Sequence, residues 1–255
     1  MALGRLKTNV RFGIAGGARR IAAMSFALLI GFPTLVRATD HFTCYSTRTT
    51  SGTVGFAAVS GVSVVDPFRS STTTVVRPKY FCAPTNKNNE DPTAPSHPDH
   101  LTDFSTKTAK LPPAALGQHF LDQFGSLILD VKGPLTLQVP SEKSTTGTPP
   151  TPAAPGVDHF QCYSVRTPAG AARFLPVSGV TIQDQFGSMT VDVKRPTRVC
   201  APADKNNEAP GAETHADHLL CYKIKQTSLP RFARVTGLFV NHQFGPEWLD
   251  AKVPK

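Results

Sequence analysis

Short stretches in which apolar and polar residues alternate recur along the chain and predict half-buried β-strands. Every second residue is apolar in Val62-Ser-Val64, in Val180-Thr-Ile182 and in Met189-Thr-Val191-Asp-Val193. No window of twelve residues shows a sustained helical period of 3.6 residues with capping residues at its ends. The pattern therefore predicts an all-β fold.

These stretches belong to a repeat whose copies begin at Asp40, Asp99, Asp158 and Asp217, 59 residues apart. Each copy opens on Asp-His and an apolar residue, and copies one, three and four continue to Cys-Tyr. An apolar run with an internal glycine and a final Phe follows, and then a Val-rich strand that ends in Pro. The glycines predict β-bulges, and the prolines predict strand ends or sheet edges. We expect the Tyr of the first strand to face the core.

The domain organisation follows from the size of one copy and from the composition between copies. One copy of about 45 residues is too small to bury an adequate core, so two copies should pack together. Residues 144–156 read STTGTPPTPAAPG, which is typical of an extended Pro-rich linker. We therefore predict two small sandwich- or barrel-like domains, at 39–143 and 157–255, each with two copies.

The first 38 residues have the features of a secretory signal peptide. Basic residues extend to Arg20, residues 21–36 are mostly apolar, and Val36-Arg37-Ala38 places small residues where signal peptidase reads them. The apolar run is shorter than the roughly 20 residues of a membrane span and contains Pro33. We expect cleavage after Ala38, no membrane span in the mature chain, and a secreted, periplasmic or cell-surface location.

Charge argues against a nucleic-acid partner once this segment is removed. The whole chain has a formal net charge of +9, from 27 basic and 18 acidic residues. Six of the basic residues and none of the acidic ones lie in the first 38 residues, which leaves +3 for the remainder. A balance this small predicts no extended basic face.

The five cysteines suggest a disulfide framework, because an exported protein meets an oxidising compartment. Cys44 and Cys82 are 38 residues apart, and so are Cys162 and Cys200. Copy two has Asp103 and Gln138 at these positions, so both cysteines are absent together. This pattern predicts Cys44–Cys82 and Cys162–Cys200 bonds. Buried thiols or metal ligands are the alternatives, although the chain has no Cys-x-x-Cys spacing typical of zinc sites.

Cys221 is left without a partner under this scheme, because the matching position would be residue 258 and the sequence ends at Lys255. An odd cysteine in an exported protein is either a buried free thiol or an intermolecular link. We expect a free thiol that can form a disulfide-linked dimer or a mixed disulfide.

Two His-x-Asp-His segments are the candidates for metal ligation. His97 and Asp99 point to the same side of an extended segment, and so do His215 and Asp217. Copies one and three keep Asp-His without the upstream His, which favours a polar strand entry instead.

No catalytic residues are predicted. Asp66, Asp122 and Asp184 each stand two residues before the repeated Phe, with His242 in copy four. A carboxylate that recurs in most copies is more typical of a turn than of a single active site. The chain has no Gly-x-Ser-x-Gly elbow and no phosphate-binding glycine loop, and no cofactor is expected.

The motifs Asp-His-Phe-x-Cys-Tyr, Asp-Gln-Phe-Gly, Val-x-Val-Lys-x-Pro, Cys-Ala-Pro and Lys-Asn-Asn-Glu together resemble an uncharacterised tandem repeat domain of secreted or surface proteins from environmental bacteria. The resemblance covers most of residues 40–255 and implies a bacterial exported protein, without an activity. Copy two departs from it by lacking both cysteines.

The functional hypothesis is a non-enzymatic exported repeat module that binds an extracellular protein or glycan. Repetition, disulfides, a Pro/Thr-rich linker and the absence of a single catalytic cluster motivate it. The alternative is an exported metal-dependent or hydrolytic enzyme that uses the His-x-Asp-His residues.

Overall fold

The computed structural model describes residues 2–5, 41–152 and 156–255. The described chain is almost entirely β-strand, which confirms the predicted fold class. Its helical content consists of two short 3-10 helices, Ala94–Ser96 and Ala212–Thr214. None of these elements is a helix long and apolar enough to cross a membrane. Most of the predicted signal peptide, including its cleavage site, lies outside the described residues.

Each copy contributes a first strand and a hairpin whose second strand is long. The first strands are β2 (His41–Thr49), β6 (His100–Thr108), β9 (His159–Arg166) and β12 (Leu219–Gln226). The hairpins are β3 (Val59–Asp66) with β4 (Arg69–Pro84), β7 (Ala115–Asp122) with β8 (Gly125–Ser144), β10 (Val177–Asp184) with β11 (Gly187–Lys205), and β13 (Val235–His242) with β14 (Gly245–Pro254). The short strands β1 (Ala2–Arg5) and β5 (Asn86–Lys87) complete the sheet.

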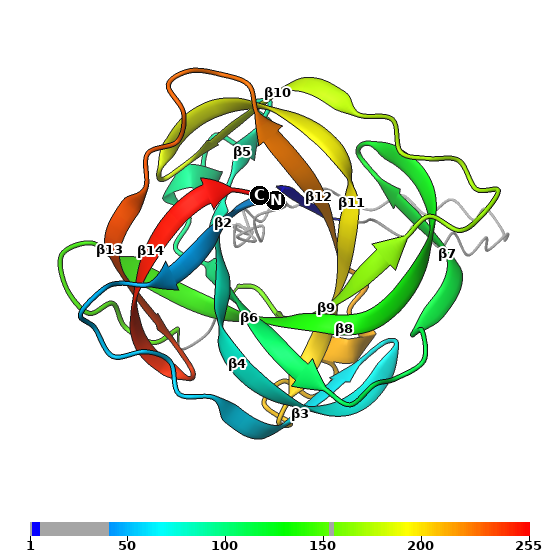
Figure 1. The fold of residues 1–255 in the computed structure, drawn as a ribbon, viewed down its shortest axis with the longest axis horizontal. Coiled ribbons are helices and arrows are strands. Elements are labelled where there is room, and N and C mark those ends of the chain that lie inside the picture. The colour runs from blue at the N-terminus through cyan, green and yellow to red at the C-terminus, as the bar shows by residue number, and fades with distance from the viewer. Residues whose placement is uncertain (1, 6–40, 153–155) are drawn as a thin grey trace, which may run out of the picture.

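The strands close into one ring, which Figure 1 shows end-on. Hydrogen-bonded neighbours follow one another in the order β2, β4, β6, β8, β9, β11, β12 and β1, and β1 pairs again with β2. All of these pairings are antiparallel. A closed ring leaves no free sheet edge along this path.

The segment at 144–156 connects strands of a shared sheet. β8 before it and β9 after it pair from Asp130↔Arg166 to Gln138↔Phe160. Pro149 of this segment is held against copy four, because the Asn241 side chain donates to the Pro149 carbonyl. The pairing of β14 with β2 joins copy four to copy one in the same way. Independent folding of 39–143 and 157–255 as two domains stays a prediction.

Alternate copies are also joined across the ring. The end of β11 pairs with β3, β5 pairs with β10, and the end of β8 pairs with β13. Copy one therefore contacts copy three, and copy two contacts copy four, through main-chain hydrogen bonds. The long second strands reach these partners because each continues past its proline.

The glycine inside each apolar run lies at a bulge. Gly179 has a φ of 75°, and the β10–β11 register shifts between Val177 and Val180. A side chain at this left-handed conformation is strained, which explains why glycine stands there. The carboxylate of Asp130 accepts the N–H of the corresponding Gly117 in copy two.

The repeated Tyr and Asp residues meet across the ring. The hydroxyl of Tyr45 donates to Asp184 at 2.7 Å, Tyr163 donates to Asp66 at 2.5 Å, and Tyr222 donates to Asp122 at 2.6 Å. All three Tyr residues are fully buried, as predicted. The other oxygen of each Asp accepts the N–H of the Phe two residues later, so the carboxylate also forms the predicted turn.

The fourth such contact uses a different pair of residues. Copy two has Phe104 in place of Tyr, and copy four has His242 in place of Asp. Their rings lie 5.0 Å apart in an edge-on arrangement. Both members of the pair change together because a buried carboxylate without a hydroxyl donor would remain unsatisfied.

The Asp184 carboxyl predicts a pH dependence of stability. Burial raises its pKa to about 6, although the Tyr45 hydroxyl and the Phe186 N–H lower it. The folded protein therefore holds this proton more tightly than the unfolded chain, whose Asp pKa is about 4. The stabilisation is complete below pH ~4 and is lost as the pH rises to ~6. We expect Asp184 to lower the free energy of unfolding by about 3 kcal/mol across this window.

Urea unfolding between pH 4 and 7 measures this effect. Asp184→Asn should flatten the slope, because the amide does not titrate. Asp66 and Asp122 also have raised pKa values from burial and should retain part of the slope. Asp192→Asn is the control, because a hydrogen bond from Lys194 lowers its carboxyl pKa. A wild-type slope in Asp184→Asn would show that this carboxyl does not titrate in the window.

Candidate functional sites

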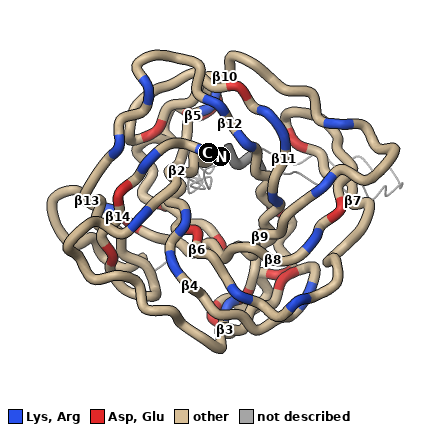
Figure 2. The backbone as a smooth tube through the Cα atoms, viewed as in Figure 1, with Lys and Arg blue, Asp and Glu red and all other residues tan. Residues whose placement is uncertain are grey.

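Basic side chains gather on one rim of the ring, which we call the basic rim. It comprises the ends of the four first strands, the segments around the prolines of β4, β8 and β11, and the end of β14. Figure 2 shows Lys and Arg around the ring axis on these strands. They are Arg48, Arg77, Lys79, Lys107, Lys132, Arg166, Lys194, Arg195, Lys223, Lys225, Lys252 and Lys255, all exposed or half-buried.

Three carboxylates partly neutralise the basic rim. Asp130 contacts Lys132 at 3.0 Å and Arg166 at 3.6 Å, Asp192 contacts Lys194 at 2.9 Å, and Asp250 contacts Arg48 at 3.0 Å. The remaining cations exceed these acids by a wide margin. The basic rim is therefore a surface of positive potential, which attracts anionic ligands.

The opposite rim, which we call the acidic rim, is formed where the first strands begin and β4, β8 and β11 end. Two of its three lysines are buried beside carboxylates, with Lys87 paired to Glu90 and Lys205 paired to Glu208. Its exposed or half-buried acids are Glu90, Asp91, Asp99, Glu142, Asp158, Glu208, Glu213 and Asp217. The small net charge of residues 39–255 thus averages two rims of opposite sign.

The basic rim is hollowed between copies two and three. A cavity of about 390 Å³ has Leu129, Val165, Phe174 and Pro196 among its apolar lining residues. The basic residues that line it are Arg166, Arg173, Lys194 and Arg195, and none of its lining residues is acidic. A hollow lined by both apolar and basic side chains suits a ligand that carries both carbon surface and negative charge.

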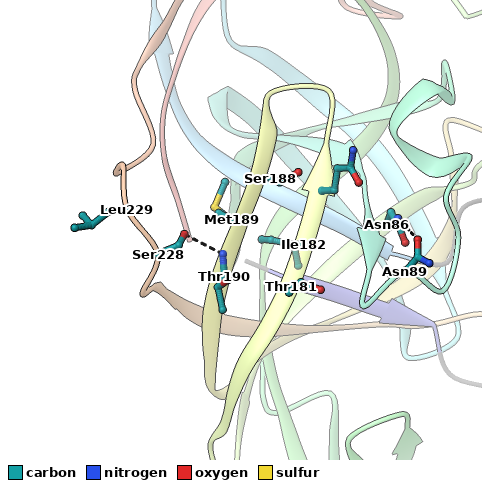
Figure 3. Close-up of a pocket in the computed structure, with 10 residues that line it drawn as sticks. Asn86, Asn89, Thr181, Ile182, Ser188, Met189, Thr190, Ser228 and Leu229 are labelled. Atoms are coloured by element: carbon teal, nitrogen blue, oxygen red, sulfur yellow. Dashed lines mark hydrogen bonds between the residues drawn. The ribbon is translucent and has the colours of Figure 1, made fainter.

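A second cavity, of about 280 Å³, is lined by residues of copies one, three and four (Figure 3). Asn86, Asn89, Thr181, Ser188 and Ser228 supply amides and hydroxyls, and no charged residue lines it. Its polar groups partly satisfy one another, since Asn86 donates to Asn89 and the Thr190 N–H donates to Ser228. These internal hydrogen bonds stabilise the local structure and leave fewer polar groups for a ligand.

A buried polar cluster lies inside the ring where copy two lacks its disulfide. The Arg198 guanidinium donates to Asp103 at 2.7 Å and to the Thr136 hydroxyl at 2.6 Å. Its carbon Cζ lies 4.9 Å from the centre of the Tyr80 ring. Burial lowers the pKa of Arg198, but the charge and hydrogen bond of Asp103, together with Cys221 and Tyr80, raise it above its usual value, so Arg198 stays protonated. Sequence reasoning missed this residue, although copy three alone has Arg at the position of Tyr80.

The cysteines lie in the same interior. Disulfides join Cys44 to Cys82 and Cys162 to Cys200, the two pairs that the repeat aligns. Cys221 is a buried free thiol, and its Sγ lies 3.5 Å from that of Cys200. Burial raises the pKa of the Cys221 thiol to about 12.

The predicted metal ligands lie on or near the acidic rim. The Nδ1 atom of His97 is 3.8 Å from a carboxylate oxygen of Asp99, which also accepts the Gly156 N–H. His215 pairs with Asp158 at 2.9 Å. Within the described residues, no group of three or more His, Cys, Asp or Glu side chains could hold a metal ion. Metal binding by His97, Asp99, His215 and Asp217 stays a prediction.

A family model described as a repeat of unknown function (DUF7450) matches residues 104–249. This chain belongs to the DUF7450 family. The match begins in copy two and ends in copy four, so it spans the 144–156 segment. Comparisons with curated proteins and with solved structures give no match. The predicted resemblance to an uncharacterised cysteine-containing repeat is thereby confirmed.

Proposed function

We propose that this DUF7450 protein is an exported, non-enzymatic module that binds an anionic glycan through the basic rim. The separation of charge between the two rims carries the proposal. Each copy adds cations to the same rim, so a linear anionic polymer can contact several copies at once. A ring held by main-chain pairing between neighbouring and alternate copies provides a rigid platform for such contacts.

The hollow between copies two and three supports a glycan in particular. Phe174 and Pro196 offer apolar surface on which a sugar ring can lie, while Arg166 and Arg195 are placed to meet carboxylate or sulfate groups. The two disulfides and the signal-like N-terminus favour an extracellular setting for this contact.

The binding experiment compares a sulfated polysaccharide, a polyuronate, neutral dextran and duplex DNA as immobilised probes. We expect the protein to bind the anionic glycans, to ignore dextran, and to release them as salt rises. Arg166→Gln/Arg195→Gln should weaken glycan binding on the order of tenfold, which corresponds to about 1.4 kcal/mol. The decrease follows from removing two convergent cations from the hollow.

A matched variant separates site from net charge. Lys110→Gln/Arg234→Gln removes the same charge from exposed loop positions that do not line the hollow, and we expect less than a twofold change. Equal effects of the two double variants would contradict a site in the hollow. Duplex DNA binding at the same salt with higher affinity than either glycan would replace the proposal with a nucleic-acid partner.

A further inference from the structure

One position of the ring differs from the others. In copies one to three, the long strand continues past its proline and lies between the first strand of its own copy and that of the next copy. In copy four, β14 ends at Pro254. The position between β12 and β2 is filled by β1 instead (Figure 1).

The closing strands share one register. In β4, Cys82 lies opposite Cys44 of its own copy and opposite Leu101 of the next copy. The same arrangement recurs in β11, where Cys200 lies opposite Cys162 and Leu219. Each of these two closing strands therefore places a cysteine opposite a cysteine on one side and opposite an apolar residue on the other.

The position between β12 and β2 has the same register. Leu3 of β1 lies opposite Cys221 on one side and opposite Phe42 on the other. Leu3 thus stands where Cys82 and Cys200 stand in their strands, and Cys221 stands where Cys44 and Cys162 stand. Cleavage after Ala38, as predicted, removes β1 and leaves the main-chain groups of β12 and β2 unpaired along this gap.

We propose that the gap between β12 and β2 accepts a further closing β-strand, and that this strand carries an apolar-Cys-Ala-Pro sequence whose cysteine bonds to Cys221. The sequence is that of the two cysteine-bearing closing strands, Phe81-Cys82-Ala83-Pro84 and Val199-Cys200-Ala201-Pro202. Strand addition satisfies both open edges at once, and the register brings the two sulfurs together. The occupant is therefore a closing strand of this repeat type.

The covalent step is a thiol–disulfide exchange. The Cys221 thiol gives its proton to solvent, and its sulfur attacks the occupant's cysteine sulfur, which arrives as a mixed disulfide with a small thiol. The new bond joins the occupant to Cys221, and the small thiol leaves with the electron pair and takes up a proton. The thiol has apolar neighbours in Phe42 and Leu219, so it is inert until a strand enters in register.

The experiment uses the exported protein and a nine-residue peptide with the sequence of residues 197–205, TRVCAPADK, supplied as its glutathione mixed disulfide. The reversed sequence, KDAPACVRT, has the same composition and cysteine but places different residues beside the flanking strands. We expect one peptide per protein at Cys221, formed at least tenfold faster with the first peptide. Peptide mapping locates the bond, and Cys221→Ser should form no adduct.

Mass spectrometry first establishes whether residues 2–5 remain. If they do, Leu3→Pro is used, because proline removes a donor from β1 and frees the gap. Equal rates for the two peptides, or no adduct on the native protein, would overturn the proposal. A Cys221–Cys221 dimer or a Cys200–Cys221 bond as the main product would also overturn it, because neither needs a strand in the gap.

Discussion

Replacing Arg198 by Met is expected to lower the free energy of unfolding by about 3–5 kcal/mol, as measured by urea unfolding near pH 7. Arg198 is 5% exposed, and Asp103, its partner at 2.7 Å, is fully buried. The other Asp103 oxygen, Oδ1, and both polar atoms of the Gln138 amide have no hydrogen-bond partner among the described residues. Removing the guanidinium therefore leaves a buried carboxylate with little else to stabilise its charge.

Two further variants test whether the charge pair is the cause. Arg198→Met/Asp103→Leu removes both charges and should recover most of the loss, because well-packed apolar residues often replace a buried ion pair at little cost. Lys194→Met breaks the more exposed pair with Asp192 and should cost less than about 1 kcal/mol. A double variant as unstable as Arg198→Met would show that lost packing, and not the unpaired charge, dominates.

The local features of the fold were predictable because they depend on neighbouring residues. Alternation identified strands such as β10, glycine at Gly179 identified a bulge, and the repeat aligned the cysteine pairs. The closure of four copies into one ring was not predictable in this way. It depends on pairings such as β14 with β2, which join residues about 200 positions apart and leave no local signature. A proline-rich composition describes a linker's stiffness, and says nothing about whether its ends lie in one sheet.

The basic rim was not predicted, because the net charge sums the charges of both rims. The net charge of +3 for residues 39–255 argued against a basic face, yet a shared Lys-x-Pro sequence places its lysine on one rim in copies two to four. The Asp-His and Lys-Asn-Asn-Glu motifs place acids on the other rim. The sequence would have predicted both charged rims if each motif had been assigned to the start or the end of its strand. Arg198 was harder to find, because its partner Asp103 lies in another copy at a position where the repeat expects cysteine.

Removing one disulfide has the second large expected effect. The Cys44–Cys82 bond closes a 38-residue separation, for which the chain-entropy model gives about 4 kcal/mol of stabilisation. Cys44→Ala/Cys82→Ala should therefore lower the free energy of unfolding by roughly this amount in oxidised protein. The bond cross-links the neighbouring strands β2 and β4 at paired positions. Its loss therefore weakens the attachment of β2, which also pairs with β14 and joins copy one to copy four.

Cys221→Ala is the matched control, since it removes a buried sulfur from the same interior without breaking a bond. It should cost about 1 kcal/mol, the contribution of a small buried apolar group. The Cys162–Cys200 bond closes the same 38-residue separation. Cys162→Ala/Cys200→Ala should therefore lose as much free energy of unfolding as the copy-one variant. Copy two has no disulfide, and Asp103 at its first cysteine position pairs with Arg198 of copy three instead. If either disulfide variant unfolds at the same urea concentration as Cys221→Ala, main-chain pairing between the copies holds the ring by itself, and the covalent framework contributes little to it.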